Sequence, residues 1–158
     1  MREIGLTYPR HLLELWKRGT LHRVLFARYK GLFDEDDLKV VRIQHKRGLH
    51  FPEWYGAVYF WKLGYKVLIE KYAFAKQHRR KFEKVSELVG KRGMRFLAHP
   101  TPCAQPPDLF IYDENLGVYF FAEVKRDKDR LSAKQRAFFE EIEQRLSCQV
   151  LIAKLKAK

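Results

Sequence analysis

Residues 107–125 read PDLFIYDENLGVYFFAEVK, and this stretch decides the fold. Two runs rich in aromatic and branched aliphatic residues, 108–112 and 118–125, are separated by residues 113–117, where Asp, Asn and Gly favour a tight turn. Two such runs joined by a short turn are typical of paired antiparallel strands. The stretch therefore predicts a β-hairpin.

The second predicted strand presents a carboxylate beside an ammonium group. Residues two apart in a strand point to the same face, so Glu123 and Lys125 emerge together while Val124 turns toward the core. Asp108 begins the first strand, and antiparallel pairing across the turn brings it close to Glu123. We therefore expect two carboxylates and a lysine at one place on the sheet.

These residue types are the ones that phosphodiester cleavage needs. Hard oxygen ligands hold Mg²⁺, and the bound ion stabilises charge on a phosphate and generates hydroxide. In this interpretation Asp108 and Glu123 bind the metal, together with the backbone carbonyl of Val124. Lys125 positions the attacking water or helps to deprotonate it. The alternative is a cross-strand ion pair on a solvated sheet face, which is commoner than catalysis for a single Glu-x-Lys motif.

The motifs in and after the hairpin resemble those of a known family. In chain order they are Pro107-Asp108, Glu123-Val-Lys125 and Asp129-Arg-Leu-Ser-Ala-Lys-Gln135. Together they resemble the PD-(D/E)XK nuclease superfamily, and specifically its VRR-NUC family, over residues 105–155 with a fainter extension back to residue 52. The resemblance implies a structure-selective, metal-dependent DNA nuclease with a mixed sheet flanked by helices.

The resemblance also implies roles for two residues outside the hairpin. In the superfamily a glutamate on the helix before the first core strand often completes the metal site, and Glu53 occupies the matching place. Gln135 resembles the family's helix glutamine, which would orient water or contact phosphate beside Lys125. The alternatives are a first-turn carboxylate that stabilises the helix dipole, and an ordinary exposed helix amide.

The rest of the chain predicts an α/β fold with a restriction-endonuclease-like core. Apolar spacing, Pro, Gly and Ser signals predict helices over residues 52–64 and 73–90 and after Ser132, and strands over residues 65–69, 94–97 and 149–153. Residues 1–50 read as short helical segments, with the acidic run 34–37 favouring a helix start over a metal site. We expect one compact domain: an N-terminal helical extension (1–50) packed on a nuclease-like domain (51–158) with a mixed four-stranded sheet flanked by helices.

The charge of the chain favours a polyanionic partner. It carries 32 Lys and Arg against 19 Asp and Glu, a formal net charge of +13. On the predicted helix 73–90, Lys81 is expected on the basic side away from the apolar face. The residues expected to hold phosphates are Arg126, Lys128, Arg130, Ser132 and Lys134 near the predicted centre, and Arg79 and Arg80 on that helix. Without motifs that read base edges, we expect recognition of DNA shape and backbone.

The leading hypothesis is a DNA nuclease that uses Mg²⁺ or Mn²⁺ and acts on branched, flapped or single-stranded DNA rather than plain duplex. The alternatives are a non-catalytic nucleic-acid-binding module with the same fold, and a subunit that organises a larger DNA-processing complex. The resemblance also makes a homodimer an expectation. Two widely spaced cysteines, with no signal peptide or membrane span in the sequence, predict a cytoplasmic or nucleoid-associated protein without a membrane partner.

Overall fold

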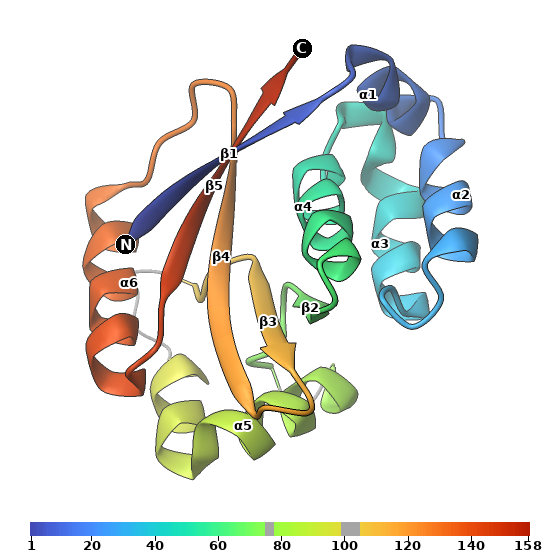
Figure 1. Ribbon diagram of the computed structural model, residues 1–158. Coiled ribbons are helices and arrows are strands. Elements are labelled where there is room, and N and C mark those ends of the chain that lie inside the picture. Colours follow the sequence, from blue (N-terminus) through green and yellow to red (C-terminus); the bar gives the residue numbers. More distant parts are fainter. Residues whose placement is uncertain (75–77, 99–104) are drawn as a thin grey trace.

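The computed structural model describes residues 1–74, 78–98 and 105–158. Its centre is a five-stranded mixed sheet in the order β1-β5-β4-β3-β2 (Figure 1). Strand β5 is parallel to both β1 and β4, whereas β2-β3 and β3-β4 are antiparallel pairs. The strands are β1 (Arg2–Tyr8), β2 (Lys66–Ile69), β3 (Leu109–Asp113), β4 (Val118–Arg126) and β5 (Val150–Ala157).

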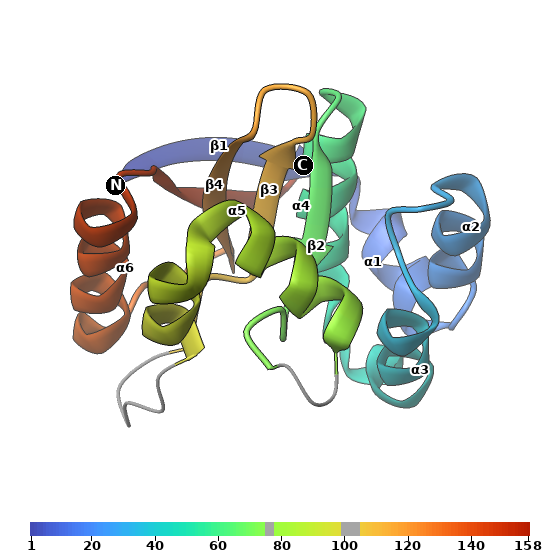
Figure 2. The same ribbon diagram turned by 90° about the horizontal axis from the view of Figure 1, so that it is seen from below.

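Helices cover both faces of this sheet. Figures 1 and 2 show α4 against one face with α1 to α3 outside it, and α5 and α6 against the other. The helices are α1 (Arg10–Lys17), α2 (Leu21–Arg28), α3 (Glu35–Gln44), the short 3-10 helix η1 (His45–Arg47), α4 (Phe51–Lys62), α5 (Arg79–Ala98) and α6 (Ala133–Leu146). The predicted α/β class and the mixed sheet flanked by helices are confirmed.

Alternation along β4 divides the interior into two cores. Ala122 and Val124 belong to the core beneath α4, whereas Phe121 belongs to the core beneath α5 and α6. Glu123 lies between buried neighbours and is itself only 4% exposed. A carboxylate at such a position is costly unless it is paired, so its partners decide what the site can do.

The predicted hairpin is present. Leu109 pairs with Ala122, and Asp113 with Val118. In the turn, Oδ1 of Asp113 accepts hydrogen bonds from the backbone N–H groups of Asn115 and Leu116. Gly117 ends the turn at φ 65°, a conformation that glycine adopts without steric cost. Local turn chemistry therefore fixes the register that brings the two strands together.

The prediction of four strands was wrong, because residues 2–8 form a strand and not part of a helical extension. Ile4, Leu6 and Tyr8 face inward with period two, and Thr7 between them is exposed. This strand, β1, runs parallel to β5, from the pair Arg2–Leu151 to the pair Tyr8–Ala157. The polar residues within this segment, and its large distance in sequence from β5, make the pairing undetectable from the local sequence pattern.

Helix α5 also differs from the prediction. It begins at Arg79 instead of residue 73 and continues to Ala98, so residues 94–97 are helical and not a strand. Gly90, at φ 78° and ψ 171°, bends the chain there and lets the helix resume. Met94 and Leu97, three residues apart, then pack into the core beneath α5 and α6. The helix is favoured over a strand here because it buries both of these side chains.

The helices that precede α4 share its core. The ring of Phe33 stacks on Trp54 at a centroid distance of 3.6 Å, and Trp16 meets Trp54 edge to face at 5.2 Å. The acidic run starts α3, since Asp34 and Asp37 form a capping box. The division between residues 1–50 and 51–158 stays a prediction. Cys103 lies outside the described residues, and none of the described helices has the length and apolar character needed to cross a membrane.

Candidate active site

The hairpin brings Asp108 and Glu123 side by side. Since Leu109 pairs with Ala122, the residues one step outward, Asp108 and Glu123, lie opposite each other. The backbone N–H of Asp108 donates to Oε2 of Glu123 over 3.2 Å, and the N–H of Val124 donates to Oδ2 of Asp108 over 2.9 Å. These bonds hold the half-buried carboxylate of Asp108, just before β3, beside the buried carboxylate of Glu123 in β4.

Lys125 and Gln135 complete a polar network around Glu123. The Nζ atom of Lys125 lies 2.8 Å from Oε1 of Glu123, and Nε2 of Gln135 donates to the same oxygen over 3.1 Å. Lys125 also donates to Oε1 of Gln135 over 3.4 Å. Lys125 therefore lies beside Glu123, and Gln135 beside Lys125, as predicted from the sequence.

A capping box fixes Gln135 in this network. Ser132 is the N-cap of α6, and its hydroxyl accepts from the backbone N–H of Gln135, whose own Oε1 accepts from the N–H of Ser132. The start of α6 is thus held by the same glutamine that contacts Glu123. One side chain serves both helix capping and the polar network.

Glu53 approaches from the first turn of α4. This helix packs closely on β4 because Gly56 has no side chain: a Cβ there would lie 3.0 Å from Cγ2 of Val124. A cleft of about 240 Å³ opens between α4 and the end of β4. Its lining includes Arg47, His50, Glu53, Asp108, Glu123 and Lys125. The predicted carboxylates and the lysine therefore border one cleft.

The carboxylates in this cleft are electrostatically crowded. Burial raises the pKa of Asp108 well above its ordinary value, and the charges of Glu123 and Glu53 raise it further. Burial, followed by the charge of Glu70, raises the pKa of Glu53 to about 7. These carboxyl groups therefore repel one another when they are ionised, and a bound proton or cation stabilises them.

Two further residues, His50 and Glu70, lie beside Glu53 and were missed in the sequence. One ligand atom each from His50, Glu53 and Glu70 lies within 4.8 Å of the other two. Both His50 (φ 68°) and Glu70 (φ 46°) have left-handed backbones, which are uncommon outside glycine. Glu70 directly follows a buried strand, and His50 stands three residues before Glu53 at the start of a helix. Their positions at the ends of these elements were the signal in the sequence that could have identified them.

The predicted metal ligands are arranged differently from this trio. Within the described part of the chain, Asp108, Glu123 and Glu53 do not gather as tightly as His50, Glu53 and Glu70 do. The carboxylate of Asp108 instead accepts a hydrogen bond from the backbone N–H of Val124. Val124 therefore contacts Asp108 through its backbone N–H. The group of Val124 that was predicted from the sequence as a metal ligand is its backbone carbonyl.

The donor set nevertheless fits a hard divalent cation. Oε2 of Glu53 is buried and has no hydrogen-bond partner among the described residues. An orphaned carboxylate oxygen is costly in a protein interior, and a cation would satisfy it. The same ion would relieve the repulsion that raises the pKa of Asp108 and Glu53. Buried oxygen donors of this kind are those that divalent cations prefer.

The residues predicted to hold phosphates divide into three groups. Arg126 lines the cleft that holds Asp108, and the exposed loop that follows it carries Lys128 and Arg130. Ser132 and Lys134 are exposed at the start of α6. Arg79 and Arg80 are exposed on α5, with their guanidinium groups paired to Glu83 and Asp34.

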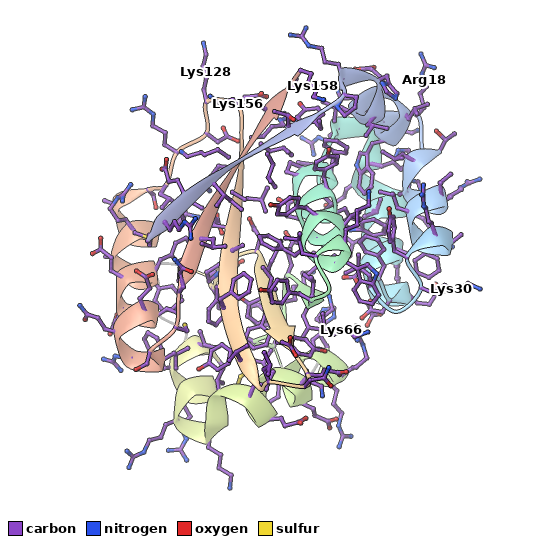
Figure 3. All side chains as sticks on the ribbon, viewed as in Figure 1. Arg18, Lys30, Lys66, Lys128, Lys156 and Lys158 are labelled. Atoms are coloured by element: carbon purple, nitrogen blue, oxygen red, sulfur yellow. The ribbon has the colours of Figure 1, made fainter. Side chains whose placement is uncertain are left out.

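Basic side chains gather at the end of the molecule that carries the loop after β4. Figure 3 shows Lys128, Lys156, Lys158 and Arg18 pointing outward at this end, whereas Lys30 and Lys66 lie elsewhere. A groove beside the loop is lined by four basic residues, Lys128, Arg130, Lys154 and Lys156, and by three acidic ones, Glu3, Asp127 and Asp129. Lys81, predicted on the exposed basic side of its helix, is instead 2% exposed, because it pairs with Asp37 and donates to the carbonyl of Ile69.

Comparison with known proteins agrees with this arrangement. The model of the VRR-NUC domain matches residues 61–155, which include β2, β3, β4, α5, α6 and most of β5. No curated protein matches the chain by sequence. The matched region carries Asp108, Glu123 and Lys125, which line the cleft, and Gln135, which donates to Glu123. The chain therefore belongs to the VRR-NUC family, a family of PD-(D/E)XK-like nuclease domains.

Proposed function

We propose that this protein is a metal-dependent DNA nuclease that hydrolyses phosphodiester bonds and selects its substrate by DNA structure. The observation that carries the proposal is the convergence of Asp108, Glu123 and Lys125 at one cleft, linked by contacts of 2.8 to 3.2 Å. A solvated cross-strand ion pair, the alternative for this motif, would not be expected to bury Glu123 to 4% exposure.

Asp108, Glu123, Glu53 and the carbonyl of Val124 are the groups that would hold Mg²⁺ or Mn²⁺. When bound, the ion supplies charge stabilisation for the phosphate and lowers the pKa of a coordinated water. Support for a cation comes from the orphaned oxygen of Glu53 and from the mutual repulsion of the carboxylates. Val124 lines the cleft beside Asp108, to which its backbone N–H donates, and its carbonyl is the fourth group of this set.

Lys125 and Gln135 would act on the water and the phosphate. The side chain of Lys125 is 15% exposed and lines the cleft, and its ammonium group contacts Glu123. From there it can donate to a phosphate oxygen or assist removal of a proton from the attacking water. Gln135 fixes the orientation of both partners, and the capping box with Ser132 fixes Gln135.

DNA would approach along the basic end of the molecule. Arg126 borders the cleft, and Lys128 and Arg130 extend the positive charge away from it. Such side chains contact the phosphate backbone and carry no direct sequence information. A substrate with flexible or branched strands would bend into the cleft more readily than plain duplex, and this is the reason for proposing selection by structure.

A panel of end-labelled junction, flap, single-stranded and duplex DNAs tests the proposal. With Mg²⁺ we expect cleavage of the branched, flapped or single-stranded members, and none with a chelator. Lys125→Ala should abolish cutting and leave DNA binding, whereas Lys30→Ala, an exposed lysine away from the cleft, should cut normally. Tight binding without metal-dependent cutting on any substrate would instead support a non-catalytic binding module or an organising subunit.

A further inference from the structure

We propose that His50, Glu53 and Glu70 form a second cation subsite beside Asp108 and Glu123, and that it takes a first-row transition ion such as Mn²⁺ in preference to Mg²⁺. This subsite would add to the proposed nuclease site, and only the role of its ion in catalysis rests on the proposed function. Its existence is a matter of metal binding and can be measured without DNA.

The start of α4 and the end of β2 bring the three ligand atoms together. His50 is the N-cap residue of α4, Glu53 lies in the first turn of that helix, and Glu70 follows β2. Nδ1 of His50 lies 3.4 Å from Oε2 of Glu70, and the three ligand atoms fall within 4.8 Å of one another. Atoms that share one ion at about 2.1 Å lie up to about 4 Å apart, so small side-chain rotations would suffice.

An orphaned oxygen independently points to a ligand at this place. Oε2 of Glu53 is buried and has no hydrogen-bond donor among the residues that the structure describes. A buried carboxylate oxygen without a donor is strongly unfavourable. A cation held jointly with Glu70 and His50 would remove that penalty, whereas a solvated surface cluster would have no penalty to remove.

Gln44 orients the imidazole for metal binding. Nε2 of His50 lies against Oε1 of Gln44 at the end of α3. An amide oxygen can only accept, so Nε2 carries the proton and Nδ1 faces Glu70 with its lone pair available once it is deprotonated. Metal-binding histidines usually donate their other ring N–H to an acceptor in this way. Gln44 is therefore a positioning residue for the subsite.

The imidazole decides the class of ion. Mg²⁺ strongly prefers oxygen ligands, whereas Mn²⁺ and the later divalent ions of the first row accept a nitrogen donor together with carboxylates. Asp108 and Glu123 offer oxygen only, so the two parts of the site differ in the ions they favour. His50 and Asp108 border both the cleft of about 240 Å³ and a neighbouring one of about 300 Å³, which makes the two parts adjacent.

The test combines Mn²⁺ binding by calorimetry with spin-echo electron paramagnetic resonance of the Mn²⁺-loaded full chain. Directly bound imidazole nitrogen modulates the echo, and oxygen ligands do not. The informative variants are His50→Asn, which tolerates the left-handed backbone, and Glu123→Gln, which damages the other part of the site. His11→Asn, at an exposed histidine on α1, is the matched control.

We expect nitrogen modulation in the parent protein, in His11→Asn and in Glu123→Gln, and its loss in His50→Asn. Gln44→Leu should weaken Mn²⁺ binding at this subsite by about tenfold or more. Gln44→Glu, which keeps an oxygen acceptor for Nε2 of His50, should bind Mn²⁺ about as well as the parent protein. Nitrogen modulation that is absent from the parent protein, or that survives in His50→Asn, overturns the proposal. Mg²⁺-dependent DNA cutting is scored separately, so loss of the subsite and loss of the nuclease function give different results.

Discussion

Gln135 donates a hydrogen bond to Glu123 over 3.1 Å while its own backbone N–H is capped by Ser132. The helix start and the candidate centre are thus coupled through one side chain. Ser132→Ala should lower the free energy of unfolding by about 1 kcal/mol through loss of the cap and reduce cleavage only modestly. The measurements are chemical denaturation and single-turnover cleavage.

Gln135→Ala should have the opposite balance. It removes the contact with Glu123 and Lys125 and leaves the hydroxyl of Ser132 able to cap, so we expect a cleavage rate lower by about 10- to 100-fold with a smaller loss of stability. The same two measurements apply. Equal cleavage rates for Gln135→Ala and Ser132→Ala would show that the glutamine serves the helix alone.

The titration of Glu53 should set part of the pH dependence of stability when divalent ions are removed. Burial, followed by the charge of Glu70, raises the pKa of Glu53 to about 7 from its ordinary 4.5. A raised carboxyl pKa contributes stability that is full below the unfolded value and is lost as pH rises through the folded value. The loss between pH 4.5 and 8 should be on the order of 3 kcal/mol, at about 1.4 kcal/mol for each pKa unit.

Glu53→Gln cannot titrate, so in a chelator at pH 8 it should be more stable than the parent protein. It should also lose much of the increase in Tm that Mn²⁺ gives the parent. Thermal unfolding at pH 5 and pH 8, with and without the ion, measures both effects. Glu140→Gln, at an exposed position of α6, is the control. A parent and variant that share one pH profile would contradict this assignment of Glu53.

Removing one partner of the buried ion pair between Lys81 and Asp37 should be strongly destabilising. Nζ of Lys81 lies 2.6 Å from Oδ1 of Asp37 and also donates to the carbonyl of Ile69, next to Glu70. Lys81→Met leaves a buried carboxylate without its cation, so we expect a loss of about 3 kcal/mol by denaturant unfolding. The double variant Lys81→Met with Asp37→Asn, which removes the charge but keeps an oxygen for the capping box, should recover most of the loss. A double variant as unstable as Lys81→Met alone would argue against the pairing.

The strand β1 can be tested by its alternation. Leu6 is 6% exposed and Thr7 is exposed, so Leu6→Ala should cost about 2 to 3 kcal/mol in unfolding free energy and Thr7→Ala less than about 0.5 kcal/mol. A helix over these residues would not give such alternation. Comparable losses for both substitutions would mean that residues 2–8 do not pair with β5 in this register.

Local chemistry made part of this structure predictable from the sequence. The turn at residues 113–117, the cap at Ser132 and the alternation of Glu123 and Lys125 depend on neighbours a few residues away, and all three have the predicted form. The proximity of Asp108 to Glu123 followed from the hairpin register. The family resemblance added Gln135, whose contact with Glu123 is present.

The remaining features depend on residues far apart in the sequence. Strand β1 is defined by β5, about 149 positions away in the pair Arg2–Leu151. The burial of Lys81 requires Asp37, which reaches it only when α3 packs beside α5. His50 and Glu70 meet across α4 and β2, so neither residue alone indicates a ligand. These contacts cannot be predicted from hydrophobic periodicity or turn motifs, because such patterns report only on residues close together in the sequence.

The most direct test of the central claim is the single-turnover cleavage rate of a labelled branched DNA, at saturating protein and Mg²⁺, for the parent protein and Lys125→Met. Because Lys125 faces the cleft while Glu123 retains its contact with Gln135, we expect the variant to keep DNA and metal affinity. Its rate should fall by about 10²- to 10⁴-fold, the range for loss of a group that assists proton transfer. A variant that cuts at the parent rate would contradict the account.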